Sequence, residues 1–394
     1  MREQTRKICI ATPEFPPEQW GGLARTVSRV AGHATDVGLE VHVAHFTVDS
    51  NTPILLDENR KIRKTNGFTV HNITLGKEEP VATVPDLWDC PHNLTLQMMY
   101  QSLEILDRNE RFDLFHSFFL YPVGYICGML AHRLGIPSIV TLVGNDVKRY
   151  IFSPEKVSIC RTGLENADRV VALSKDLGDM ANALTPISEK TRIIYNSVKI
   201  PLENRKINTS HSSPFRIGCA GIFKYAKGLP YLFKAVADLA VHRDIKLELV
   251  GKLRDNEKKI YDYMLSKTGI GDILKLMDPI PHDLMHQWLR GLDVFVLPSL
   301  TEGCPNVLME AMAVGVPVVA TRTGAAEHLV EDRVSGLLVP WGDSGSLASA
   351  LIQIIDDRNL GESLGAAGRT RMKSFSSVVE RRAWENVYRE LLNF

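Results

Sequence analysis

The chain has 394 residues, 44% hydrophobic and 23% charged, which is enough apolar material for two globular cores. Its 46 basic and 46 acidic residues cancel, which excludes a global electrostatic attraction to nucleic acid or to an anionic membrane. The six cysteines are scattered without a C-x-x-C pair, which argues against a zinc site or a disulfide framework. The N-terminal apolar run is too short for a signal peptide or a membrane span, so we expect a cytoplasmic protein.

Short β-branched runs alternate with helical patterns along the first half, which is typical of βαβ units and a parallel sheet. Helices are expected between the strands, as at Leu23–Val37 and Tyr121–Leu134. The predicted strands are Lys7–Thr12, Glu40–Phe46, Thr69–Leu75, Asp113–Ser117, Pro137–Leu142, Arg169–Leu173 and Thr191–Tyr195.

A polar, proline-bounded stretch, residues 201–214, predicts a linker, and after it the alternation restarts. The predicted strands are Phe215–Ala220, Lys246–Val250, Val294–Pro298, Pro317–Thr321 and Gly336–Val339, and the helices are Leu229–Val241, Asn256–Lys267, Asn306–Val314 and Ser377–Leu392. We therefore predict an α/β protein with two Rossmann-like domains, residues 1–200 and 215–375, that face a cleft. The C-terminal helix, residues 376–394, is expected to pack back on the first domain.

The most informative segment is residues 298–321, PSLTEGCPNVLMEAMAVGVPVVAT. A strand ends at Pro298, a glycine-containing loop follows, and Pro305 precedes a helix, so free backbone N–H groups and the helix dipole are presented to an anion. Glu302 and Glu310 lie on either side of this anion seat and can each accept hydrogen bonds from vicinal hydroxyls. Taken by themselves, the two glutamates could be ordinary exposed acids on a surface helix. The complete segment of loop and helix favours a site for a diphosphate flanked by a ribose and a hexose.

Two lysines, Lys224 and Lys227, follow the first strand of the second domain in GIFKYAKG, residues 221–228. At a strand's carboxyl end they can neutralise charge on a leaving diphosphate, a role that needs no metal. Two solvated lysines in a loop are the alternative.

These residues resemble the retaining GT-B glycosyltransferases of family 4, and the resemblance covers essentially the whole chain. Its strongest marker is the E-x7-E motif, met by Glu302 and Glu310 within PSxxEGxPxxxxEAMAxGxPVVA. The resemblance implies that Glu302 binds the donor sugar, that Glu310 binds the ribose and that Lys227 binds phosphate. Backbone amides around Gly303, Cys304, Pro305, Asn306 and Val307 are implied to meet the sugar and the phosphates. The family often has arginine where this chain has Ile222, and Lys224 is the candidate to supply that cation.

In the first half the resemblance implies three further sets of residues. Gly21 and Gly22 resemble the family's glycine loop, which approaches the donor phosphate. His116 ends a strand where the family often has His-x-His, and it is a candidate catalytic contact; a structural histidine is the alternative, since the second position is Phe118. Asn145 and Asp146 match a loop that faces the acceptor.

The resemblance implies transfer with retention, in which the acceptor hydroxyl attacks on the side where the diphosphate leaves, and it implies no metal and no cofactor. UDP-glucose is the favoured donor, with other UDP- or GDP-hexoses left open. The acceptor is expected to be a glycan or a lipid-linked hydroxyl in polysaccharide biosynthesis, with contact at the inner face of the membrane left open. Residues 80–100 are a candidate acceptor groove or an ordinary packed segment.

Three other functions remain open from the sequence: a nucleotide-sugar epimerase, a glycosidase with paired carboxylates, and a non-catalytic nucleotide-sugar binder. A glycosidase requires both acids across one bond, and here a helix N-terminus lies between them. A dehydrogenase is disfavoured because the first strand is followed by EFPPEQWGG, not by G-x-G-x-x-G.

Overall fold

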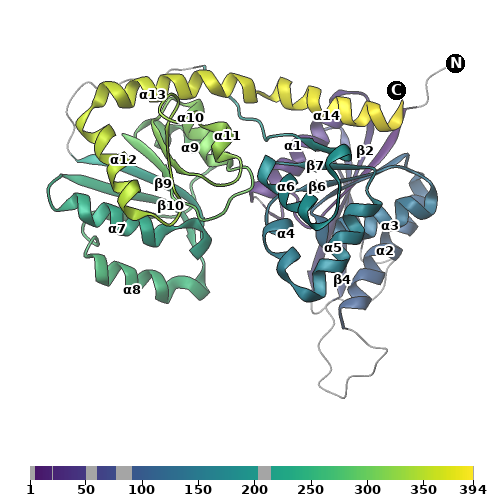
Figure 1. The fold of residues 1–394 in the computed structure, drawn as a ribbon. Coiled ribbons are helices and arrows are strands. Elements are labelled where there is room, and N and C mark those ends of the chain that lie inside the picture. The colour runs from purple at the N-terminus through teal and green to yellow at the C-terminus, as the bar shows by residue number, and fades with distance from the viewer. Residues whose placement is uncertain (1–4, 20, 50–59, 77–90, 203–213, 394) are drawn as a thin grey trace. The chain divides into compact units, whose positions relative to one another are not determined.

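A computed structural model describes residues 5–19, 21–49, 60–76, 91–202 and 214–393 (Figure 1). It divides the chain into two compact units, Met1–Tyr195 with Glu380–Phe394, and Asn196–Val379. Most of the predicted linker lies outside the described residues, as does the first part of the candidate acceptor groove. Each unit holds its own largely parallel sheet with helices, so the predicted α/β class with two Rossmann-like domains is confirmed.

The described residues of the first unit form an eight-stranded sheet in the order β3-β4-β2-β1-β5-β6-β7-β8. Among these strands, only β3 and β4 pair antiparallel. Its strands are β1 (Lys7–Thr12), β2 (Glu40–Asp49), β3 (Arg60–Thr65), β4 (Phe68–Gly76), β5 (Leu114–Phe118), β6 (Ser138–Leu142), β7 (Arg169–Ala172) and β8 (Thr191–Ile193). Its first helices are α1 (Gly22–Asp36), α2 (Pro91–Glu110), α3 (Tyr125–Leu134), α4 (Asn145–Lys148), α5 (Pro154–Asn166) and α6 (Lys175–Leu184). Strand β1 is central, which explains why its sequence is apolar on both faces.

Helix α14 (Ser377–Leu392) packs on the first unit from Glu380 onward. The buried Glu380 carboxylate accepts hydrogen bonds from Arg29 at 2.6 and 3.1 Å and lies 3.2 Å from His33, both on α1. Trp384 and Tyr388 are buried against Phe118 and His116. A charged link and an aromatic cluster therefore hold residues from the end of the chain against the first unit.

The second unit contains a six-stranded parallel sheet in the order β11-β10-β9-β12-β13-β14. Its strands are β9 (Phe215–Phe223), β10 (Ile245–Leu253), β11 (Leu274–Met277), β12 (Val294–Leu297), β13 (Val318–Thr321) and β14 (Leu337–Val339). Its helices are α7 (Leu229–Ala240), α8 (Lys258–Thr268), α9 (His282–Arg290), α10 (Asn306–Ala313), α11 (Ala326–Leu329), α12 (Ser344–Asp356) and α13 (Arg358–Arg371).

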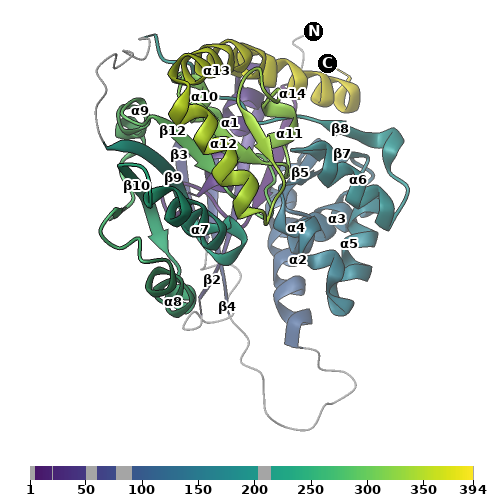
Figure 2. The same ribbon diagram turned by 60° about the vertical axis from the view of Figure 1, so that its left-hand side comes forward.

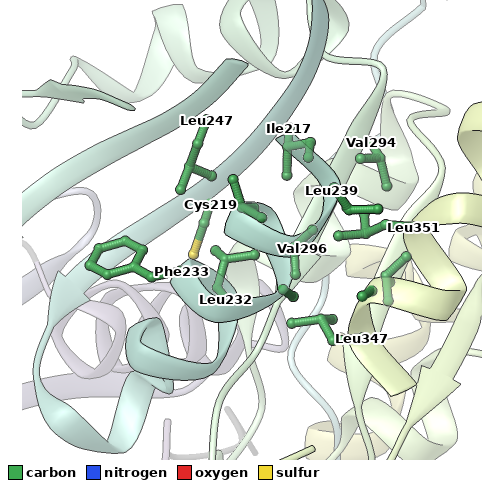
Figure 3. Close-up of a cluster of buried hydrophobic side chains, with 14 of the residues drawn as sticks. Ile217, Cys219, Leu232, Phe233, Leu239, Leu247, Val294, Val296, Leu347 and Leu351 are labelled. Atoms are coloured by element: carbon green, nitrogen blue, oxygen red, sulfur yellow. The ribbon is translucent and has the colours of Figure 1, made fainter. Parts of the chain in front are cut away.

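The core of the second unit lies between its sheet and the helices α7 and α12, which pack side by side (Figures 1 and 2). Figure 3 shows the side chains that fill it: Ile217, Cys219, Leu247, Val294 and Val296 from the strands, and Leu232, Phe233, Leu239, Leu347 and Leu351 from the helices. Burying each large apolar side chain contributes about 1.5–3 kcal/mol relative to leaving it exposed. This core fixes the strand ends that carry the candidate site.

Three details differ from the expected elements. Strand β3 covers the basic run of residues 60–64, where no strand was predicted; charged residues are common on edge strands. Strand β11 was not predicted, because it is a short, half-exposed edge strand. Strand β9 continues to Phe223, so the loop that carries the lysines begins only at Lys224.

None of the helices within the described ranges is long and apolar enough to cross a bilayer.

Candidate active site

Helix α10 begins at Asn306 without a side-chain cap. The carbonyl of Pro305 accepts the N–H groups of Leu308 at 3.1 Å and Met309 at 3.4 Å, so the first turn is closed. The amides ahead of that turn have no acceptor inside a helix and point out of its N-terminus. Together with the helix dipole, the backbone of Asn306 and Val307 therefore offers a place for an anion.

Lys227 and Glu302 are joined directly. The ammonium of Lys227 donates to the Glu302 carboxylate at 2.6 Å, and the hydroxyl of Ser299 donates to the same oxygen at 2.6 Å. The Glu302 side chain is only 9% exposed, so the pair is partly shielded from water. The residue predicted to bind phosphate, Lys227, and the residue predicted to bind the sugar, Glu302, are thus neighbours in the second unit.

Glycines hold the two loops of this site together. A Cβ at Gly228, which has φ +67°, would lie 1.9 Å from the carbonyl oxygen of Pro298, and the N–H of Leu300 donates to Ala226 at 2.9 Å. Gly324 has φ +57°, and a Cβ there would lie 2.4 Å from the carbonyl oxygen of Glu302. Only glycine permits these close approaches. Gly228 brings the lysine loop against the residue that follows β12, and Gly324 brings the segment after β13 against the loop before α10.

Glu310 lies in the middle of α10 and is 6% exposed. Side chains on a helix lean toward its N-terminus, so the carboxylate is directed along the same end of α10 that presents the free amides. Asn306, at the start of α10, is oriented by Asn196, whose side chain is buried and donates to Asn306 Oδ1 at 2.8 Å. Gly303 and Cys304 lie between Glu302 and Pro305, and the Gly303 carbonyl accepts the N–H of Ala325.

Lys224 lies just beyond β9, close to Lys227. Burial lowers the pKa of Lys224, and the positive charges of Lys227 and Arg254 lower it further. The repulsion among these cations is relieved when an anion binds among them.

Sequence reasoning did not single out two residues of this network. Ser299 shares the Glu302 oxygen with Lys227, and Thr323 accepts the backbone N–H of Glu302 at 3.2 Å. Ser299 lies only three residues before Glu302, and this proximity in sequence could have indicated that it belongs to the site. Nothing in the sequence indicated Thr323, because it follows a different strand.

The glycine loop of the first unit is occupied by a carboxylate. Gly21 is the N-cap of α1 with an ordinary φ of −65°, and Gly22 is the first residue of the helix. A Cβ at Gly21 would lie 3.1 Å from Glu14 Oε2. Burial raises the pKa of Glu14, and a hydrogen bond from the Ala24 backbone lowers it in part. A side chain at position 21 would require the flexible Glu14 carboxylate to shift slightly. The approach of Gly21 and Gly22 to the donor phosphate stays a prediction.

Asp146 is fully buried, and its role on the acceptor side stays a prediction. Its carboxylate accepts the backbone N–H groups of Leu120, Val143, Gly144 and Val147. It therefore fixes the loop after β6 against the turn Leu120–Gly124. Asn145 begins α4, and its side chain lies outside what the structure describes.

His116 is also fully buried, which favours the structural alternative, and its contact with the reacting centre stays a prediction. Its Nδ1 lies 2.9 Å from the Tyr388 hydroxyl and its Nε2 lies 2.8 Å from the Thr141 hydroxyl, so both ring nitrogens are engaged. Burial lowers its pKa to about 3, which keeps the imidazole neutral. The structural alternative explains His116: it anchors α14.

Within the described residues, one group of side chains has ligand atoms close enough together to hold a metal ion: His42, His71 and Glu110. His42 Nδ1 and His71 Nε2 lie 2.9 Å apart as a hydrogen bond. The ammonium of Lys7 lies 3.1 Å from Glu110 and 3.1 Å from Glu40, so a cation already compensates these carboxylates. The cluster lies beside the first residue of β1, at the opposite end of that strand from the glycine loop, and we assign it to packing.

Sequence models of two related families match the two halves of the chain. Residues 20–200 match Glycosyltransferase Family 4, and residues 214–357 match Glycosyl transferases group 1. A D-inositol 3-phosphate glycosyltransferase of Pseudarthrobacter chlorophenolicus is 24% identical over 379 residues, which is 90% of this chain and 86% of that protein.

Solved structures of the GT-B type share the fold. Sucrose-phosphate synthase from Thermosynechococcus elongatus superimposes with a TM-score of 0.79 at 21% identity, over 98% of this chain and 99% of that one. HepE of Anabaena, solved with UDP-glucose, gives 0.75 at 19% identity, over 98% and 100%. The chain therefore belongs to the GT-B glycosyltransferases, with a family 4 domain in its first half and a group 1 domain in its second, and it is a transferase of sugar residues.

Proposed function

We propose that the protein transfers a hexose, with UDP-glucose the favoured donor, to a hydroxyl of a glycan or lipid-linked acceptor in polysaccharide biosynthesis. The observation that carries the proposal is the uncapped N-terminus of α10 beside the bonded pair Lys227–Glu302. The dipole of α10 and the ammonium of Lys227 can attract a diphosphate, and the carboxylate of Glu302 can accept hydrogen bonds from a sugar. The bound UDP-glucose of HepE supports the choice of donor.

In the proposed complex, the diphosphate takes the ammonium of Lys227 and the amides of Asn306 and Val307. The Glu302 carboxylate then exchanges part of its ion pair for hydroxyls of the hexose. The positive charge stabilises the leaving diphosphate as negative charge develops on it, which is the role otherwise given to a metal ion. The acceptor hydroxyl attacks on the face that the diphosphate leaves, and its proton passes to the leaving phosphate oxygen, so the configuration is retained.

The test is an assay of UDP and GDP release from a panel of nucleotide sugars, with and without a metal chelator. We expect release from one UDP-hexose, enhanced by a hydroxylated acceptor and unchanged by the chelator. Proton NMR of the same mixtures separates the open alternatives: an epimerase changes the sugar and releases no nucleotide, and a non-catalytic binder does neither. A strict requirement for Mg²⁺ or Mn²⁺ would contradict the metal-free mechanism.

Glu310 is proposed to hold the ribose hydroxyls, and Glu310→Ala tests this role. Hydrogen bonds to a charged group contribute about 1.5–3 kcal/mol, so the variant should bind UDP about 10- to 150-fold more weakly. The matched ligand is 2′,3′-dideoxy-UDP, which lacks both hydroxyls and should bind the two proteins with equal affinity. Calorimetric titration measures all four affinities, and an equal loss for both ligands would instead indicate a damaged helix.

A further inference from the structure

The carboxyl ends of β9 and β10 form an exposed cationic edge beside the proposed donor site. The two strands pair in parallel with Ile222 opposite Lys252 and Phe223 opposite Leu253. Phe223 is buried and Leu253 packs against the same core, so the alternating residues Ile222 and Lys252 share the opposite, exposed face. Arg254 follows at once, with its N–H donating to the Phe223 carbonyl at 3.1 Å.

A hollow of about 410 Å³ lies at this edge, lined by Ile222 and by residues 252–256. Its walls therefore carry two cations, Lys252 and Arg254, and one carboxylate, Asp255. They surround an apolar residue, Ile222, which is 55% exposed. Ile222 is one residue from the end of β9, after which the loop of Lys224 and Lys227 begins.

Four cations lie at this edge, Lys224, Lys227, Lys252 and Arg254, and three carboxylates face them, Asp255, Glu257 and Glu302. The charge of Arg254 acts on Lys224 together with that of Lys227. Of the two acids that also act on Lys224, Glu302 is bonded to Lys227 and Ser299, and Glu257 accepts the Tyr225 backbone N–H. In the part of the chain that the structure describes, Arg254 has no ion pair of its own.

We propose that Arg254 is a substrate-binding residue that contacts the diphosphate of the donor from the end of β10. A guanidinium can meet two phosphate oxygens with parallel hydrogen bonds, which a lysine cannot do. Arg254, Lys224 and Lys227 then surround the diphosphate opposite the α10 amides. The inference rests on the proposed function, because it names a further contact of the same donor.

Calorimetric titration with UDP and with uridine tests the contact. Arg254→Ala should weaken UDP binding about tenfold or more while leaving uridine binding unchanged, because uridine has no phosphate. Arg254→Lys should recover part of the loss. The control is Lys246→Ala, which removes a cation at the amino end of the same strand and should leave both affinities unchanged.

A rescue variant makes the test specific to charge at this position. Because Ile222 faces the same hollow, Ile222→Arg in the Arg254→Ala background should restore UDP binding to within about threefold of the unchanged protein. UDP binding by Arg254→Ala within twofold of the unchanged protein would overturn the inference and leave the proposed function intact. If the unchanged protein bound neither UDP nor GDP, the proposed function would fail and this contact with it.

Discussion

Replacing Lys227 with alanine is expected to lower the rate of sugar transfer by about 100-fold or more, the scale on which enzymes lose a group that stabilises developing charge. The variant removes the cation nearest to the leaving diphosphate, and it also leaves the Glu302 carboxylate without the ammonium that lies 2.6 Å away. An uncompensated carboxylate at 9% exposure repels the diphosphate, so donor binding and turnover should both fall. Initial rates of UDP release across donor concentrations measure both.

The control for this experiment is Lys234→Ala, which removes an exposed lysine from α7, the helix that follows the loop of Lys227. It should transfer sugar at the normal rate and melt at the temperature of the unchanged protein. Lys227→Ala should melt earlier, because it leaves the Glu302 carboxylate without its partner, so the rates are compared at a temperature where both variants are folded. A Lys227→Ala enzyme with rates within about threefold of normal would remove Lys227 from the mechanism and leave the amides of α10 as the main stabilising group.

The resemblance and the strand patterns predicted the fold class because both depend on local sequence. Strand β1 and helix α14 have the predicted bounds, since an apolar run and a helical repeat are each legible without knowing their neighbours. Strands β3 and β11 were missed for the converse reason. Each lies at a sheet edge, where pairing with β4 or β10 stabilises a segment whose own pattern is basic or half-exposed.

The candidate site divides in the same way. Glu302, Asn306 and Glu310 belong to one continuous motif, so their proximity around the start of α10 could be predicted. The direct bond between Lys227 and Glu302 joins residues 75 positions apart, and the sequence did not predict it. The partners of the His116 ring nitrogens, Tyr388 and Thr141, come from α14 and β6, so the sequence could not choose between a catalytic and a structural histidine. A position at the carboxyl end of a strand indicates proximity to the sheet edge where ligands bind. Whether the side chain reaches a ligand depends on the packing around it.

Trp384→Ala is expected to destabilise the first unit by about 3–5 kcal/mol, the usual cost of removing a buried large aromatic side chain. Trp384 is 1% exposed, and its ring lies 5.1 Å from that of His116, 6.2 Å from that of Phe118 and 6.1 Å from that of Tyr388. The cavity would open between α14 and β5, where the hydrogen bond from His116 to Tyr388 depends on close packing. Calorimetry should show the first unit melting earlier.

The matched control is Trp341→Ala, because Trp341 is 61% exposed and its loss should leave the melting profile unchanged. The UDP affinity of the Trp384 variant separates stability from function. The proposed nucleotide contacts belong to the second unit, so UDP should bind normally at temperatures where the first unit remains folded. Equal melting of the two tryptophan variants would mean that α14 contributes little to the first unit, and the structural role assigned to His116 would lose its basis.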